Sequence, residues 1–225
     1  MQGHRRAGIR PGIVDNSYVR AAASPTLGCV HWDRLFEDLE GQLASEWEAE
    51  RAALDAESER LRIARLDLRS RLQTLCAARA AGMLELTGRR TAAVRFEEIG
   101  ADWIAASVQS ERGTSLIPLG AIRGIRLDHG QLLASLEPTT TTASPVRERM
   151  TLGFVLRDLA RRRVALTIEE HDGAPTHGTI DRAGADHLDL AVHDSGTPRR
   201  AQDVRAFRVV PFSGIVRVRI EGDPR

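Results

Sequence analysis

The chain carries one β-hairpin pattern twice, and this repeat constrains the fold more than any other feature of the sequence. Residues 177–193 read as a strand, a tight turn at 184–186 (Gly-Ala-Asp) and a second strand whose alternate residues, 188–192, are apolar. Alternation with a period of two is typical of a half-buried antiparallel strand. Residues 93–109 show the same pattern around a second Gly-Ala-Asp turn at 100–102. The sequence therefore predicts two copies of a small β unit.

Composition excludes several classes of protein. The 225 residues carry a formal net charge of +1, and every basic residue other than histidine is arginine, so the overall charge predicts no attraction to nucleic acid or to acidic membranes. Cys29 and Cys76 stand alone without a CxxC pair, so we expect no metal, no cofactor and no disulfide framework. No apolar run is long enough to cross a bilayer and no signal peptide is evident, which predicts a cytoplasmic protein.

A long helix is predicted ahead of the β units. Residues 1–31 are rich in Gly, Arg, Ser and Pro and are expected to be disordered, whereas residues 32–82 show helical periodicity that ends at Gly82. One row of apolar residues repeats every seven positions and marks an association helix or coiled coil: Trp47, Leu54, Leu61, Leu68 and Leu75.

The charge along this helix is segregated. The charged residues of segment 33–59 are mostly acidic, and those of segment 60–79 are mostly arginine. This arrangement complements the helix dipole, and it also suits an antiparallel pairing of two copies, acidic half against basic half. The second heptad row is poor, so a weak or antiparallel pairing is favoured over a long parallel zipper.

The remaining chain divides into three segments. Residues 83–127 are expected to form the first small β-barrel from short strands with regularly spaced turns. Residues 128–145, with four consecutive threonines, read as an extended Thr/Pro linker. Residues 146–221 are expected to form a helix and the second barrel. The predicted fold class is thus α+β: a long N-terminal helix followed by two small β-barrels, the second with its own preceding helix.

A helix followed by five short, bent strands resembles the Sm-like (LSm) branch of the SH3-type small barrels. The resemblance rests on the helix 154–159 (Phe-Val-Leu-Arg-Asp-Leu), on Gly178-Thr179-Ile180, and on the segment 184–188 that follows. It covers residues 146–220 well and 68–127 less well. In that family an Asp…Asn pair and an Arg-Gly step hold RNA; this chain has Arg123-Gly124 but no matching Asn. The resemblance therefore implies the fold more than an RNA pocket. The helix and duplication also resemble uncharacterised coiled-coil proteins of high-GC bacteria, which implies no function.

Three groups of residues are candidate sites. His187, Asp189 and His193 share the strand face expected to meet solvent, where a His/Asp cluster can bind metal or transfer protons, although solvated side chains are the simpler interpretation. Trp103 occupies the position of His187 in the first unit, where packing against the long helix is favoured over stacking on a base. Six arginines are candidates for binding a phosphate backbone: Arg161, Arg162, Arg163, Arg199, Arg200 and Arg205.

The sequence contains no nucleophile elbow, P-loop, dinucleotide fingerprint or HExxH motif, so no enzymatic activity and no small-molecule substrate are predicted. We expect a non-enzymatic cytoplasmic scaffold or regulatory interaction protein, which self-associates or binds a protein partner through its helix and presents the edge strands of its barrels. The alternative is an RNA- or DNA-binding regulator that uses the arginine surface of the second barrel.

Overall fold

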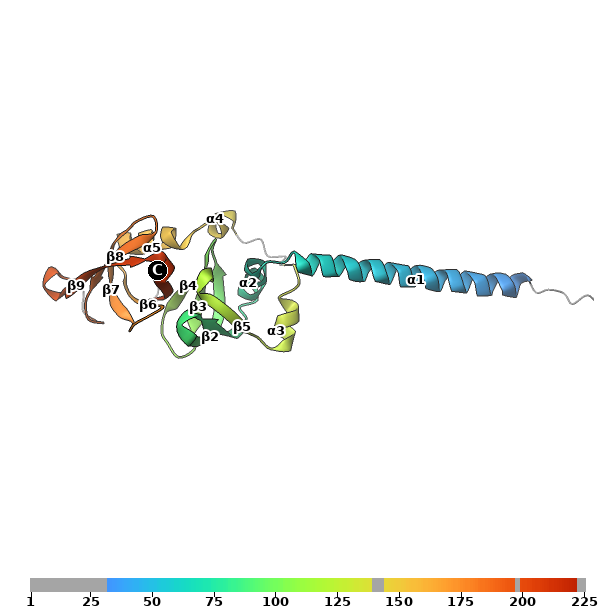
Figure 1. Ribbon diagram of the computed structural model, residues 1–225, viewed down its shortest axis with the longest axis horizontal. Helices are drawn as coiled ribbons and strands as arrows, with labels where there is room; N and C mark the ends of the chain where they lie inside the picture. Colours follow the sequence, from blue (N-terminus) through green and yellow to red (C-terminus); the bar gives the residue numbers. More distant parts are fainter. Residues whose placement is uncertain (1–31, 139–143, 197–198, 222–225) are drawn as a thin grey trace, which may run out of the picture. The chain divides into compact units, whose positions relative to one another are not determined.

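The computed structural model describes residues 32–138, 144–196 and 199–221, which form an α+β structure (Figure 1). Contacts divide the chain into an N-terminal part, residues 1–56, and a C-terminal part, residues 57–225. The described residues of the N-terminal part all belong to helix α1 (Trp32–Ala64), whose last turns belong to the C-terminal part. The C-terminal part also contains the other described helices and a sheet of ten strands. The predicted disordered head, residues 1–31, lies outside the described residues.

The predicted helix 32–82 is interrupted. α1 is followed by a separate helix, α2 (Leu68–Ala77), which begins after Asp67 because that carboxylate accepts a hydrogen bond from the Ser70 N–H at 2.7 Å and caps the helix. Gly82 does not end a helix as predicted. The left-handed residue after α2 is Arg79 (φ 46°), and Gly82 lies within the first strand, where its lack of a Cβ permits close packing against Leu127.

The first β unit follows α2 and has five strands. They are β1 (Ala81–Leu86), β2 (Arg90–Ile99), β3 (Trp103–Val108), β4 (Thr114–Pro118) and β5 (Ile122–Arg126). Short 3-10 turns, Thr87–Arg89 and Leu119–Ala121, connect β1 to β2 and β4 to β5. The predicted hairpin about residues 100–102 is therefore confirmed as β2–β3.

The segment predicted as a Thr/Pro linker contains regular structure. α3 (His129–Ala134) is capped by Asp128, and α4 (Pro145–Glu148) precedes the second unit; residues 139–143 lie outside the described residues. The helix predicted from residue 146 to 163 is also shorter than expected. α5 spans Leu152–Arg162, because Thr151 accepts a hydrogen bond from the Phe154 N–H and caps it.

The second β unit repeats the first. Its strands are β6 (Ala165–Glu170), β7 (Thr176–Ala183), β8 (His187–Val192), β9 (Ala206–Pro211) and β10 (Ile215–Ile220), with 3-10 turns at Ala201–Asp203 and Phe212–Gly214. Both hairpins carry a bulge at the equivalent place, after Phe96 in β2 and after Ile180 in β7. The Asp102 carbonyl accepts a hydrogen bond from the Leu119 N–H (2.8 Å), and the equivalent Asp186 carbonyl accepts one from the Phe212 N–H (2.7 Å). The predicted duplication thus extends to individual hydrogen bonds.

The ten strands form one continuous antiparallel sheet in the order β5-β1-β2-β3-β4-β10-β6-β7-β8-β9. In each half, the fifth strand returns beside the first. The two halves are joined where β4 pairs with β10. The prediction of two separate barrels is therefore not what the structure shows: the sheet is shared and it is not closed, since β5 and β9 remain its two edges.

Burial follows the predicted alternation in part. Leu188, Leu190, Ile104 and Ala106 are buried as expected. Ala191 and His193 are buried as well, although the alternation assigned them to solvent. His193 is enclosed because its Nε2 lies 2.9 Å from the Thr179 hydroxyl and its ring stands edge-on to His177, with 5.1 Å between ring centres. A strongly bent sheet can bury both faces of a strand near its end, which a period of two does not reveal.

Candidate association surfaces

The junction between the β units shows how this chain joins one sheet edge to another. Leu116 of β4 lies opposite Val218 of β10, and Ser115 lies opposite Arg219. Trp103, Ala105 and Leu116 from the first unit belong to the same core as the helix and strands of the second unit, while Val216 from β10 belongs to the core of the first. Each unit therefore completes the other's hydrophobic core.

A network of ion pairs covers the rim of this junction. Arg217 of β10 pairs with Glu169 of the same unit and, at 2.9 Å, with Glu111 from the β3–β4 turn of the first unit. Burial opposes the charge of Arg217, but the hydrogen bonds that its guanidinium donates to these two carboxylates outweigh burial and raise its pKa. Burial likewise acts to raise the pKa of Glu169, but the hydrogen bonds that its carboxylate accepts from Arg217 and Arg90 outweigh burial, so the pKa is lowered. Both groups remain charged in the junction and bind the two units together.

The hairpin turn of the first unit adds polar contacts to the second. The Asp102 carboxylate accepts a hydrogen bond from the Leu152 N–H at 2.7 Å, at the first turn of α5. The Trp103 indole N–H donates to the Met150 carbonyl at 2.9 Å. A carboxylate at a helix N-terminus is stabilised by unpaired amides and by the helix dipole. Trp103 thus packs against the second unit rather than against the long helix, which corrects the prediction for this residue.

Strand β9 is one free edge of the sheet, and it exposes apolar side chains. Phe207 and Val209 are 69% and 64% exposed, on a strand that pairs only with β8 among the described residues. They lie two residues apart, so they share one face of the strand. Exposed apolar side chains on an unpaired edge are typical of a strand that binds another chain.

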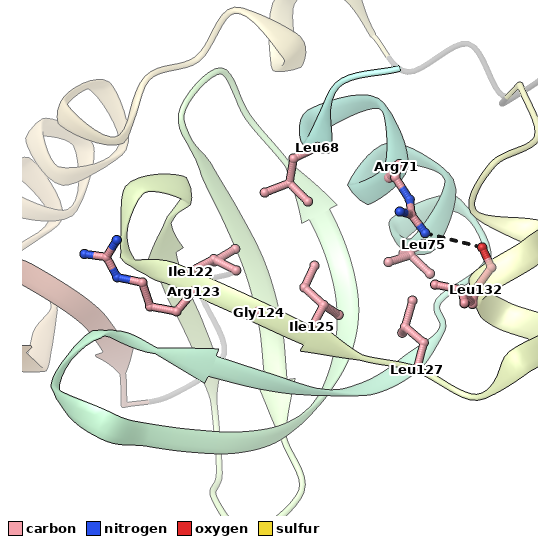
Figure 2. A pocket seen from close by; sticks show the side chains of 9 residues that line it. All are labelled: Leu68, Arg71, Leu75, Ile122, Arg123, Gly124, Ile125, Leu127 and Leu132. Atoms are coloured by element: carbon pink, nitrogen blue, oxygen red, sulfur yellow. Dashed lines mark hydrogen bonds between the residues drawn. The ribbon is translucent and has the colours of Figure 1, made fainter. Parts of the chain in front are cut away.

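A pocket of about 210 Å³ lies beside β5, at the other free edge of the sheet (Figure 2). Figure 2 shows α2 on one side and β5 on the other, with Leu132 of α3 at one end. Arg71 holds this end in place, since its guanidinium donates to the Ser135 hydroxyl at 2.7 Å. The lining is largely aliphatic and contains no carboxylate, histidine or thiol: Leu68, Arg71, Leu75, Ile122, Arg123, Gly124, Ile125, Leu127 and Leu132. Such a pocket suits an apolar side chain better than a reaction.

Helix α1 exposes a stripe of apolar side chains along its length, and none of its residues is buried. The large exposed members are Trp32, Leu35, Phe36, Leu39, Leu43, Trp47, Leu54 and Leu61. The heptad row predicted to form the association helix is therefore divided by the helix break. Trp47, Leu54 and Leu61 lie exposed on α1, Leu68 begins α2 and lines the pocket, and Leu75 is buried in the core of the first β unit.

The six candidate arginines are largely paired with acids. Asp158 binds both Arg161 and Arg162, and Asp181 binds both Arg163 (2.7 Å) and Arg199 (2.6 Å). Arg205 pairs with Asp194. Arg200 is exposed and has no ion pair among the described residues. The structure therefore gathers these arginines around the second β unit, where three carboxylates offset half of their six positive charges.

The histidine cluster does not come together as a metal site. His187 is exposed and bonds to Asp186, whereas His193 is buried beside His177. Burial lowers the pKa of His177, which keeps its ring neutral. Residues 32–138, 144–196 and 199–221 hold no group of three or more potential ligands that could bind a metal ion. In the same residues, no helix combines the length and apolar character that a membrane span requires.

Comparison with family models, with curated proteins and with solved structures finds no match to this chain. The evidence for function therefore lies in the chain's own surfaces. Sequence reasoning did not find the pocket beside β5 or the exposed pair on β9. A weak signal for the latter was present, because Arg208 lies between Phe207 and Val209 in the sequence.

Proposed function

We propose that this protein is a non-enzymatic association protein, a scaffold that holds partners on helix α1 and on the free edges of its sheet. The observation that carries the proposal is the apolar stripe of α1, a 33-residue helix without a single buried residue. Burying one large apolar side chain contributes roughly 1.5–3 kcal/mol, so a partner that covers this stripe would gain a large part of its affinity there. Isolated helices are marginal in water, and a partner would also stabilise the helix.

The charge of α1 restricts the chemistry of its partner. The helix carries ten acidic residues and four arginines, an excess of six negative charges. The arginine-rich segment that was expected to complement this charge in an antiparallel pair starts only at the end of α1 and continues on α2, which packs on the first β unit. A basic partner surface therefore suits α1 better than a second α1 does.

The shared strand order of the two β units supports the Sm-like part of the proposal. In both units five short strands follow a helix, as in the Sm-like barrels that the chain resembles, and the fifth strand returns beside the first. The scaffold would thus consist of two such units fused through β4 and β10, with β5 and β9 available to partners.

The experiment that tests the proposal replaces Trp47, Leu54 and Leu61 together by glutamate in the full chain. We expect the triple variant to lose bound partner protein or oligomeric mass, measured by light scattering on the protein purified at several salt concentrations. The matched control places the same three charges on the opposite face of α1, at Ala49, Ala52 and Ala56, and should keep its mass. The association role of α1 would be refuted if wild type and triple variant had equal masses at every salt concentration and neither bound a partner.

Salt also distinguishes the two kinds of partner. Self-pairing of the acidic α1 should strengthen as salt screens the repulsion, whereas a basic partner should dissociate. The alternative function, binding of RNA or DNA through the arginine surface, has weaker support because Asp158, Asp181 and Asp194 already pair with five of the six arginines. Nucleic acid that copurifies and is released at high salt would favour that alternative.

A further inference from the structure

We infer that α1 binds a basic amphipathic helix of a partner protein, with arginine or lysine at the positions that pack against the acidic residues of the α1 stripe. The inference rests on the proposed association role of α1, and it deepens that role by naming the fold and the charge pattern of the partner. Its basis is the order of residues along the face of α1 that carries the stripe. Along this face, apolar and acidic side chains alternate.

The face is identified by heptad spacing. When two helices pair, the residues between them recur at steps of three and four, the a and d positions of a heptad. The exposed row that starts at Trp47 and continues through Leu54 and Leu61 supplies the a positions. Phe36 and Leu43, also exposed and seven residues apart, supply d positions, because Leu43 lies four residues before Trp47. The two rows therefore share one face of the helix.

The remaining positions of this face are all acidic. Extending both rows over residues 33–61 gives nine positions, of which five are apolar and four are acidic. In chain order they are Asp33, Phe36, Glu40, Leu43, Trp47, Glu50, Leu54, Glu57 and Leu61. None of the four arginines of α1 takes one of these positions. The stripe therefore offers a partner apolar contacts and negative charge in a fixed order.

The carboxylates of this face lack strong partners within the chain. Asp33, Glu40 and Glu50 are exposed and form no ion pair among the residues that the structure describes. Glu57 pairs with Arg60 at 3.5 Å, but their side chains are 61% and 79% exposed, and so exposed a pair adds little. A helix that packs on the stripe removes these carboxylates from water, which is unfavourable unless each meets a cation. The partner must therefore supply cations.

A second copy of α1 does not supply them. In a parallel pair, each acidic position faces the same position of the other copy, which gives four like-charge contacts. The antiparallel pair that packs apolar on apolar residues also sets acid against acid, with Asp33 opposite Glu57 and Glu40 opposite Glu50. Like charges in these positions select against self-pairing and favour a partner of opposite charge. A basic helix satisfies both halves of the pattern, because the aliphatic stems of arginine and lysine cover apolar surface while their charged ends reach the carboxylates.

The test uses the full chain and two synthetic peptides as probes, each as long as residues 33–61 and designed as its parallel partner. Both peptides carry leucine at the positions that face apolar residues. The basic peptide carries arginine at the positions that face the acids, and the acidic peptide carries glutamate there. Fluorescence anisotropy of the labelled peptide gives the dissociation constant at physiological salt. The wild-type chain should bind the basic peptide at least about tenfold more tightly than the acidic one.

Charge reversal on the stripe tests the register. Glu50→Lys with Glu57→Lys should weaken binding of the basic peptide by about tenfold or more and strengthen binding of the acidic peptide. The matched control, Glu48→Lys with Asp55→Lys, makes the same change in net charge on the opposite face and should leave both affinities nearly unchanged. Glu50→Gln with Glu57→Gln replaces the lysine pair if circular dichroism shows that the latter chain has lost helix.

Three results would each overturn the inference: equal affinity for the two peptides, binding of neither peptide, or equal effects of the two double substitutions. Wild-type dimers that form at low salt and are lost in the triple glutamate variant would also overturn it, with a second copy as the occupant of the stripe. The triple variant separates these failures from failure of the proposed function. If it loses mass or partner while charge reversal has no effect, the association role of α1 stands and the basic helix does not.

Discussion

Replacing Leu116 and Val209 by alanine, one at a time, tests whether burial at the internal junction determines the stability of the 57–221 unit. The two residues occupy equivalent positions of the repeat, in β4 and β9. Leu116 is 3% exposed and belongs to the core that the two β units share. Leu→Ala in a core costs about 2–5 kcal/mol, so Leu116→Ala should lower the free energy of unfolding by about 3 kcal/mol.

The edge residue should behave differently. Val209 is largely exposed, so truncating it removes little buried area and should cost below about 1 kcal/mol. For a unit of this size, 1 kcal/mol corresponds to roughly 2–4 °C in Tm, which puts the Leu116 variant roughly 6–12 °C below wild type.

Urea unfolding monitored by Trp103 fluorescence measures both costs, because this indole is buried at the junction. Trp32 and Trp47 on α1 should first be replaced by phenylalanine so that Trp103 is the only emitter. The measurement is made at low protein concentration and repeated at twice that concentration, so that association through β9 does not contribute. Equal costs for the two variants, within about 0.5 kcal/mol, would refute the reasoning that the β4–β10 junction is a core rather than a mere edge contact.

Three further outcomes follow from single residues. The pKa of Glu169 is held below its usual 4.5, so the stability that this carboxylate contributes is present above that value and is lost as the pH falls through the lowered pKa. Glu169→Gln should therefore flatten the decline in stability on acidification, measured by thermal melts from neutral to acidic pH. An unchanged decline would argue against the paired carboxylate. Asp67→Ala should cost about 1 kcal/mol, because α2 loses its cap, and a melt that matches wild type would count against the cap. Gly178→Ala should destabilise the protein by at least about 1–3 kcal/mol, because the added Cβ would lie 2.4 Å from the backbone oxygen of Ala191. The control, Gly120→Ala, places its Cβ in open space and should be near neutral. Similar melting temperatures for the two variants would contradict this packing.

Local features of the fold could be predicted because they are encoded in short segments. The turns at 100–102 and 184–186 and the alternation of residues 188–192 correspond to observed elements. Turn chemistry and period-two alternation depend on neighbouring residues only, and so they survive in any tertiary context that forms a sheet.

The break after α1 was missed although its signal was present. Asp67 is a preferred N-cap residue, followed at the third position by the Ser70 amide that it binds. The row of leucines every seven residues continued across it and suggested one helix. Packing decided the outcome, because Leu75 gains more from the core of the first β unit than from a helical stripe in solvent.

The candidate site depended on tertiary structure to a greater degree. The arginines could be located on the second β unit from sequence, but the pairing of each with a particular carboxylate could not, since it depends on side-chain placement. The pocket beside β5 is built from α2, β5 and Leu132 of α3, which come together only when the sheet has formed.

The sequence by itself determined that this protein is built from one β unit used twice, each behind a helix, because periodicity and turns are written within a few residues. Only the tertiary structure decided how the two units are joined. The pairing of Leu116 with Val218 links residues far apart in the chain, and it depends on two complementary edges, one core and one set of ion pairs forming together. For the same reason, only the structure shows that β5 and β9 are the two edge strands of the sheet, each with one neighbouring strand.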